Sequence, residues 1–193
     1  METSPRTTVH LDATQLRALA HPLRMRLLGA LRLHGPATAT RLAEQLGTNS
    51  GKTSYHLRQL AEVGLVEEVP ERGNARDRWW RAAHDSTSWD PSEFLDDPDT
   101  TTAADWLAGQ VARTHARWTS DFVAARSEWP PEWIAASTLS DYSLRLRPDR
   151  LRRLNEEIGA LIETYRDDSA SDTADAERVT IVLHTFPHPE PTL

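Results

Sequence analysis

The sequence contains no cysteine. Disulfide bonds, thiolate zinc sites, thiolate metal sensing and cysteine nucleophiles are therefore all excluded. It also has no apolar run of the roughly 18 residues that a membrane helix needs, and the polar stretch from Met1 to Thr8 has no apolar signal core. We expect a cytoplasmic protein with no membrane partner.

Motifs that carry catalysis are missing as well. The carboxylates fall mostly in segments expected to be linkers or helix exteriors, and no nucleophile elbow, phosphate-binding loop or metal-hydrolase pair is present. The histidines of the second half, His115, His184 and His188, lack the paired spacing of a metal site. The sequence therefore predicts neither an enzyme nor a bound metal or cofactor.

A net charge of -7 taken over the whole chain argues against a nucleic-acid partner, but the charge is unevenly distributed. Residues 1–84 carry 12 Arg and Lys against 8 Asp and Glu, whereas residues 85–193 carry 10 against 21. Because nucleic-acid binding depends on the local electrostatic field, residues 1–84 are the candidate nucleic-acid-binding part of the chain.

Four helices are predicted in this first part from apolar spacing near 3.6 residues and from residues that begin or end helices. They lie between Asp12 and His21, between Pro22 and Gly35, between Thr38 or Thr40 and Gly47, and between Asn49 and Gly64. Two strand-like segments follow, Leu65 to Pro70 and Arg78 to Ala83, with a polar turn at residues 71–77. This order of elements describes a winged helix-turn-helix.

The helix that begins at Asn49 has the features of a helix that enters the major groove. Small or polar residues in its first turns allow its backbone to approach the base edges, and a capped N-terminus directs free amides at phosphate. Arg58 is placed to neutralise a phosphate, and arginines of the turn can reach phosphate or the minor groove. The candidate DNA-binding residues are Asn49, Ser50, Gly51, Lys52, Ser54, Tyr55, His56, Arg58, Arg72, Asn74, Arg76 and Arg78. The alternative is an ordinary solvated helix face and hairpin tip, with His56 serving in packing.

Four sequence stretches resemble the winged-helix core of bacterial ArsR-like regulators. They are Ala-Leu-Ala-His-Pro-Leu-Arg-Met-Arg-Leu-Leu (18–28), Leu-Ala-Glu-Gln-Leu-Gly (42–47), Thr-Ser-Tyr-His-Leu-Arg-Gln-Leu (53–60) and Val-Gly-Leu-Val-Glu (63–67). The resemblance covers residues 12–83. It implies DNA binding, with reading positions at Ser50, Gly51, Lys52, Ser54 and Tyr55 and with His56 and Arg58 at the family's His-Leu-Arg step.

The sensor residues of many ArsR-like proteins are absent, since residues 38–46 contain neither Cys nor His. The second half instead concentrates aromatic residues within 28 positions: Trp106, Trp118, Phe122, Trp129 and Trp133. These side chains can line an apolar pocket for a small organic effector. Core or dimer packing is the competing interpretation.

The whole chain is expected to be an α+β protein. The predicted parts are a winged helix-turn-helix domain at 1–84, a linker at 85–101, and a helix-strand-helix-strand module at 102–193 that supports dimerisation. Within that module, helices are predicted at 102–126 and 148–167 and strands at 140–147 and 179–187, with a small acidic segment at 168–177 between them.

These features predict a homodimeric repressor that binds a pseudo-palindromic operator in double-stranded DNA. One recognition helix touches few base pairs, so specific binding normally requires two half-sites presented to a twofold dimer. The first helix and the apolar stripe from Leu107 to Ala125 are the expected dimer contacts. Two alternatives stay open: a protein-interaction winged helix, and a ligand-binding or enzymatic C-terminal domain with a vestigial DNA reader.

Overall fold

The computed structural model describes residues 7–73, 78–167 and 176–188. The chain divides into two compact units, one formed by Ser4–Ala116 and the other by Arg117–Leu193 together with Met1–Thr3. Helices and small sheets occur together, which confirms the α+β class. The described residues include no helix long and apolar enough to cross a membrane.

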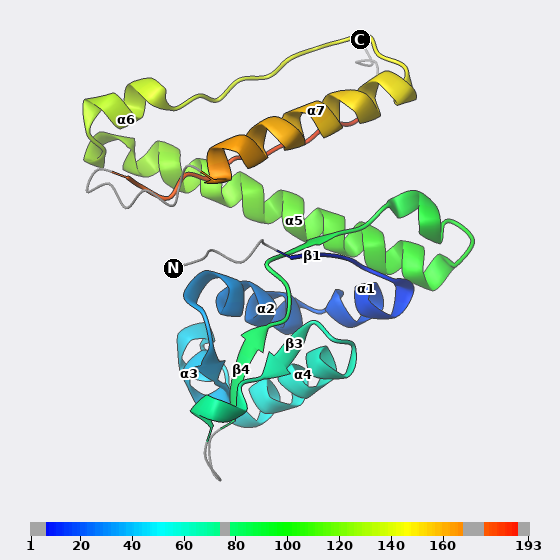
Figure 1. Ribbon diagram of the computed structural model, residues 1–193, viewed down its shortest axis with the longest axis vertical. Helices are drawn as coiled ribbons and strands as arrows, with labels where there is room; N and C mark the ends of the chain where they lie inside the picture. Colours follow the sequence, from blue (N-terminus) through cyan, green and yellow to red (C-terminus); the bar gives the residue numbers. More distant parts are fainter. Residues whose placement is uncertain (1–6, 74–77, 168–175, 189–193) are drawn as a thin grey trace. The chain divides into compact units, whose positions relative to one another are not determined.

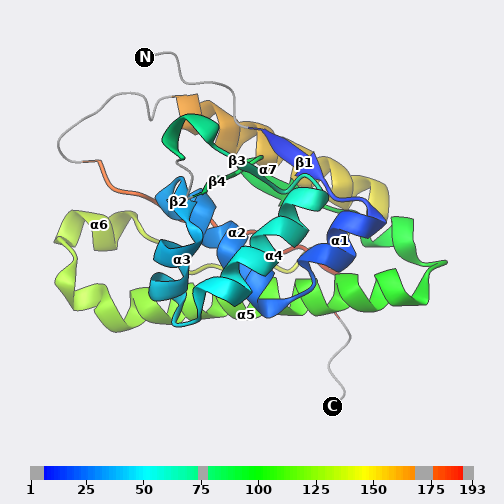
Figure 2. The same ribbon diagram turned by 90° about the horizontal axis from the view of Figure 1, so that it is seen from below.

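The N-terminal unit contains the predicted winged helix-turn-helix (Figure 1). Its elements are β1 Thr8–His10, α1 Ala13–Leu19, α2 Pro22–His34, β2 Ala37–Thr38, α3 Ala39–Leu46, α4 Ser50–Glu62, β3 Val66–Glu68, η1 Pro70–Arg72, β4 Trp79–Ala82, β5 Ser86–Ser88, η2 Pro91–Phe94 and the first part of α5 Pro98–Ala125. Figure 2 shows α4 across α2 and beside α3, while β3 contacts α4 and β4 packs against α2.

Polar side chains fix the starts of the helices. The carboxylate of Asp12 accepts a hydrogen bond from the Gln15 amide at 2.8 Å, and the Gln15 side chain accepts one from the Asp12 amide. Thr38, rather than Thr40, is the N-cap of α3. Gly47, with φ of 64°, ends α3 in the left-handed conformation that glycine adopts at little cost.

One apolar cluster holds this unit together. It combines leucines of α1, α2, α3 and α4 with residues of the wing and of α5, and its fully buried members include Leu16, Leu27, Leu42, Leu57 and Leu60. The two leucines of α4 are 0% exposed. Burial of each such side chain contributes roughly 2 kcal/mol, so α4 is fixed by its inner face.

The wing is a three-stranded sheet in the order β2-β4-β3. β3 and β4 are antiparallel, with Val66 opposite Ala82 and Glu68 opposite Trp80. These strands lie within the two predicted segments. Residues 74–77, the centre of the predicted turn, lie outside the described residues.

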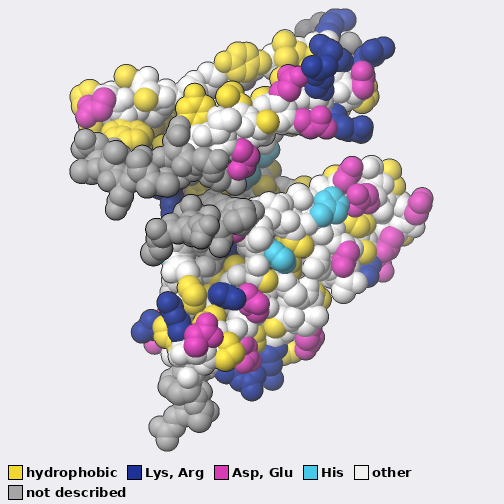
Figure 3. Space-filling model, viewed as in Figure 1, with side chains coloured by type: hydrophobic (Ala, Val, Ile, Leu, Met, Phe, Trp, Pro, Cys, Tyr) yellow, Lys and Arg dark blue, Asp and Glu magenta, His cyan; other side chains and the backbone are white. Residues whose placement is uncertain are grey.

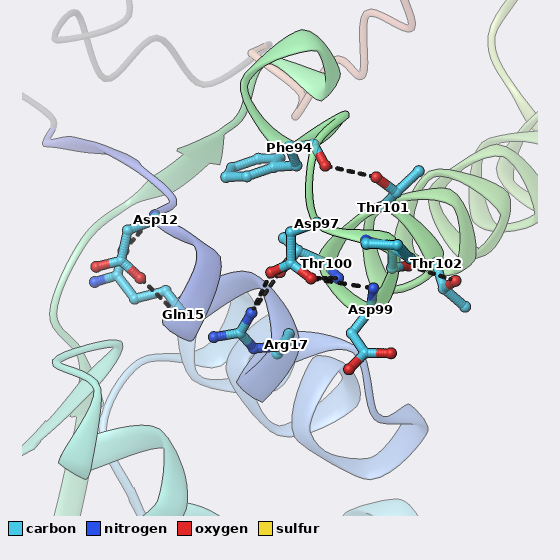
Figure 4. Close-up of polar contacts among 10 residues, drawn as sticks. Asp12, Gln15, Arg17, Phe94, Asp97, Asp99, Thr100, Thr101 and Thr102 are labelled. Carbon is cyan, nitrogen blue, oxygen red and sulfur yellow. Dashed lines mark hydrogen bonds and ion pairs between the residues drawn. The ribbon is translucent and has the colours of Figure 1, made fainter.

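The segment predicted as a linker is packed rather than free. It contains β5, which pairs in parallel with β1, the short helix η2, and the start of α5. Phe94 is 8% exposed and Thr100 is 0% exposed. Arg17 donates hydrogen bonds to Asp97 and Thr100, and Thr101 Oγ1 donates to the Phe94 carbonyl, which ties α1 and η2 to the start of α5 (Figure 4).

The C-terminal unit contains the end of α5, η3 Arg126–Glu128, α6 Pro131–Ala136 and α7 Pro148–Asp167. The helix predicted at 148–167 is confirmed. The strands predicted at 140–147 and 179–187 are wrong, because residues 138–147 and 176–188 form no strand. Alternating apolar residues favour an extended chain, but a strand also needs a neighbour for its backbone hydrogen bonds, and neither segment has one among the described residues.

Candidate nucleic-acid interface

The sequence around α4 both holds the helix in place and leaves one face open. Asn49 Oδ1 accepts a hydrogen bond from the Lys52 amide at 2.8 Å, and Thr53 Oγ1 donates to the Asn49 carbonyl at 3.0 Å. Thr53 and the two core leucines of α4 are buried on the inner face. The predicted reading residues lie on the other faces, with Asn49, Ser50, Gly51, Lys52, Tyr55 and Arg58 exposed and Ser54 half-buried.

Packing within the protein does not require a glycine at Gly51, in the first turn of α4. A Cβ at this position would meet only Asn49 Oδ1, at 3.5 Å, which is an ordinary van der Waals distance. Glycine costs a helix roughly 1 kcal/mol relative to alanine. Its absent side chain instead leaves room for an outside molecule to approach the backbone of α4.

An open groove of about 360 Å³ lies between α4 and the wing. It is lined by Thr38, Ala39, Thr40, Ser50, Ser54, Arg58, Arg78 and Trp80. Ser50, Ser54 and Arg58 are four residues apart and therefore follow one line along α4. The end of this unit that holds α4 and the wing strands carries several Lys and Arg side chains (Figure 3). Hydroxyl groups and two guanidinium groups thus share one open surface, which suits a polyanion.

The predicted wing arginines have different surroundings. Arg78 forms an ion pair with Glu68 at 2.9 Å, and both side chains are exposed to solvent. Arg72 lies 6.0 Å from the centre of the Trp79 ring. Asn74 and Arg76, also predicted to bind DNA, lie outside the described residues.

Arg41 of α3 belongs to this surface and was missed in the sequence. Its guanidinium lies 5.0 Å from the centre of the same Trp79 ring, a cation–π distance. Thr40, its neighbour, lines the groove. The sequence places Arg41 in the first turn after the Thr38 cap. Its contact with Trp79 could not be predicted from the sequence, because it depends on the β2–β4 pairing, in which Thr38 lies opposite Trp79.

His56 packs on the protein rather than extending from it. Its ring centre lies 4.4 Å from that of His21 and 5.2 Å from that of Tyr55. Its Nδ1 atom is buried and has no hydrogen-bond partner among the described residues. Burial lowers the pKa of His56, and the nearby charges of His21, Arg24 and Lys52 lower it further. This environment favours the packing interpretation, and a DNA contact by His56 stays a prediction.

The two neighbouring histidines, whose ring planes are tilted by 36°, give a testable pH dependence. Burial also lowers the pKa of His21, and Arg24 adds to the effect, so both rings hold their protons less tightly in the native chain than at their ordinary pKa of 6.5. The unfolded chain therefore binds more protons, and stability falls as the pH drops below about 6.5. We expect His56→Gln to flatten this dependence in urea unfolding between about pH 7.5 and 5.5. His34→Gln, at an exposed position of α2, is the control, and an equal flattening there would contradict the explanation.

The aromatic residues of the predicted pocket are divided between the two units, with Trp106 in the N-terminal unit and the other four in the C-terminal unit. Trp106 is half-buried against the core of the N-terminal unit. Trp118 is 49% exposed and Phe122 is half-buried, while the rings of Trp129 and Trp133 lie 6.3 Å apart. The arrangement supports packing for Trp106, and the effector pocket stays a prediction. Among the described residues, no group of three or more His, Cys, Asp or Glu side chains could hold a metal ion.

Residues 19–69 match a family model described as a helix-turn-helix domain. This stretch runs from the end of α1 to the end of β3 and contains the α3–α4 pair, so the predicted helix-turn-helix is confirmed. No curated protein matches the chain.

Several solved structures are similar to parts of the chain. One is a homodimeric winged helix-turn-helix DNA-binding domain from Mycobacterium bovis, a possible ArsR-family transcriptional regulator, with 24% identity over 53% of this chain and 77% of that chain and a TM-score of 0.35. Another is a possible transcriptional regulator for arsenical resistance, with 26% identity over 61% of this chain and 97% of that chain and a TM-score of 0.32. A transcriptional regulator from Thermotoga maritima has 12% identity over 78% of this chain and 88% of that chain and a TM-score of 0.30.

Proposed function

We propose that this chain is a sequence-specific DNA-binding transcriptional regulator that acts as a homodimeric repressor on a pseudo-palindromic operator. The observation that carries the proposal is the position of α4. Its inner face is fixed by fully buried Thr53, Leu57 and Leu60, while its polar outer face borders the groove shared with the wing. The helix-turn-helix family match over residues 19–69 supports the same function.

The dimensions and chemistry of α4 suit the major groove of B-DNA. That groove is about 12 Å wide and admits one α-helix. The 13 residues of α4 begin with Ser50 and Gly51, so its first turn is narrow, and Lys52 adds a positive charge there. Arg58 and Arg78, on opposite sides of the open groove, are placed for the phosphates that flank the major groove.

A dimer follows from the size of the reading surface, because a single recognition helix covers too few base pairs for specific binding. The dimer contacts expected on the first helix and on the stripe from Leu107 to Ala125 stay a prediction. Leu16 and Leu19 of α1 are buried inside their own unit, as is Leu107 of α5. Apolar side chains farther along the chain are exposed, including Val123 at 46%. Control of the repressor by a small organic effector stays a prediction from the aromatic residues.

The proposal is tested by the salt dependence of DNA binding. Fluorescence anisotropy would measure binding to duplexes selected from a random library, over a series of salt concentrations. We expect Lys52→Ala and Arg58→Ala each to lower the slope of log affinity against log salt by about 1, because each removes one phosphate contact. Arg126→Ala removes an equal charge from an exposed position of the C-terminal unit and should leave the slope unchanged.

The same assay separates the proposal from its alternatives. A chain that shows no salt-sensitive binding to any duplex would be better described as a protein-interaction winged helix. An effect of Arg126→Ala equal to that of Lys52→Ala would show that binding follows overall charge, and α4 would then not be the reader.

A further inference from the structure

The wing sheet carries an aromatic ring with two cations beside it. Trp79 is half-buried in β4, and the guanidinium carbons of Arg41 and Arg72 lie 5.0 and 6.0 Å from the centre of its ring. Both distances are within the range of a cation–π interaction. Arg41 belongs to α3 and Arg72 to η1, so one ring gathers charges from two other elements. These three residues are called the Trp79 cluster below.

Backbone hydrogen bonds place both arginines near the ring. On one side, β2 lies beside β4 where α3 begins (Figure 2), and Thr38 of β2 is opposite Trp79. The Thr38 hydroxyl accepts a hydrogen bond from the Arg41 amide at 3.3 Å. On the other side, the Val69 amide donates to the Trp79 carbonyl at 2.8 Å, and the Val69 carbonyl accepts from the Arg72 amide at 3.1 Å. Each arginine thus lies in a short turn that starts at a backbone neighbour of Trp79.

Two further arginines of the wing differ, because each is paired with a glutamate of β3. Arg78 pairs with Glu68 at 2.9 Å, and Arg81 pairs with Glu67 at 2.8 Å. The arginines of the Trp79 cluster are exposed, and neither has a carboxylate partner among the described residues. An aromatic ring attracts a guanidinium without accepting the N–H donors at its edge. The cluster therefore holds two cations in place and leaves their hydrogen bonds to an outside molecule.

The chemistry of the cluster suits a phosphate backbone. The planar donor fork of arginine matches two oxygens of one phosphate. In DNA, the phosphates of one strand follow one another about every 3.4 Å along the helix axis. Because both guanidinium carbons lie within 6.0 Å of one ring centre, they are close enough together to contact phosphates of the same strand.

The cluster is continuous with the groove beside α4. Thr40, the neighbour of Arg41, lines that groove. So do Arg78 and Trp80, which flank Trp79 in the chain. In a helix-turn-helix, the helix before the recognition helix crosses the DNA backbone, and α3 has this place before α4. The phosphates that border a major groove occupied by α4 are therefore the ones within reach of the cluster.

We infer that Trp79 is a positioning residue for DNA binding, which holds Arg41 and Arg72 against phosphates of one strand beside the major groove that α4 enters. Without the ring, both side chains keep their charge but lose their fixed position, so that binding has to order them. The inference rests on the proposed DNA binding and adds a second phosphate-binding site, on α3 and η1, to the one on α4.

Removal of each arginine tests the phosphate contacts. Fluorescence anisotropy of the full chain, with duplexes selected from a random library, gives the slope of log affinity against log salt. We expect Arg41→Ala and Arg72→Ala each to lower this slope by about 1, because each removes one phosphate contact. Arg81→Ala is the matched control, since it removes the same charge from an arginine already paired with Glu67, and it should leave the slope unchanged. An equal decrease in Arg81→Ala, or none in the two cluster variants, would overturn the inference.

Substitution of Trp79 tests the positioning role. We expect Trp79→Leu to lower the affinity at fixed salt by about tenfold, and Trp79→Phe to keep it within about threefold, because a phenyl ring also attracts a guanidinium. In a chain that already carries Arg41→Ala and Arg72→Ala, Trp79→Leu should have no further effect, since the ring acts only through these side chains. A tenfold loss in that background as well would show that Trp79 acts through the fold, and would overturn the inference.

The variants of α4 separate this inference from the proposed function. A lower slope in Lys52→Ala with an unchanged slope in Arg41→Ala and Arg72→Ala would disprove the role of the cluster and leave DNA recognition by α4 intact. The reverse result would support the cluster and disprove the role of α4. A chain that binds no duplex would disprove both.

Discussion

Replacing Ser54 with glutamate is expected to weaken DNA binding at least about 100-fold, a loss near 3 kcal/mol, while the fold stays intact. Ser54 lines the groove between α4 and the wing, together with Arg58 and Arg78. A carboxylate there would face the phosphates and would also attract the two guanidinium groups that should bind them. Opposed like charges in an interface cost several kcal/mol.

The loss should come from charge in the groove rather than from damage to α4. Ser54 is half-buried, its side chain makes no core contact of the kind made by Leu57, and glutamate has a good helix propensity. Thr14→Glu is the matched control, because it adds the same charge at an exposed position of α1. Anisotropy would compare the affinities, and far-UV circular dichroism would compare the folds. Equal affinities of Ser54→Glu and the unchanged chain would show that α4 does not enter the DNA.

Helix α4 could be predicted because the signals that form it are local. Asn49 caps its start, Gly64 follows its end, and Leu57 and Leu60 recur on one face. Each of these effects acts within a few residues along the chain. The positions of Ser50 and Arg58 on the opposite face then follow from helix geometry alone.

The predicted effector pocket could not be established from local sequence signals. Trp106 and Trp118 are close in sequence, but both lie on α5, where 12 residues span about 18 Å. Sequence spacing therefore could not establish a shared pocket. Arg41 and Trp79 show the converse, since 38 positions separate two residues that the wing sheet brings together.

The strand predictions failed for a related reason. The alternation of Tyr142, Leu144 and Leu146 indicates that one side of the segment is apolar, which is a local property. Whether such a segment becomes a strand depends on a pairing partner elsewhere. Neither predicted segment has such a partner among the described residues.

Substitution of Phe94 tests whether the segment predicted as a linker is packed against the N-terminal unit. Its neighbourhood contains Pro91, Pro98 and many acidic residues, a composition typical of exposed connections. In the structure Phe94 is 8% exposed and belongs to the same apolar cluster as the leucines of α4. We expect Phe94→Ala to lower the free energy of unfolding of the N-terminal unit by about 3–5 kcal/mol, through lost burial and the cavity left behind.

The adjacent residue supplies the control, because Leu95 is 70% exposed. Leu95→Ala should change stability by no more than about 0.5 kcal/mol. Hydrogen exchange of the Leu57 and Leu60 amides would measure both effects, since these amides exchange only when the core around α4 opens. Equal protection in the two variants would mean that η2 is a true linker, detached from the rest of the N-terminal unit in solution. A large difference between two neighbouring residues would instead establish that the unit that positions α4 extends through η2 into α5.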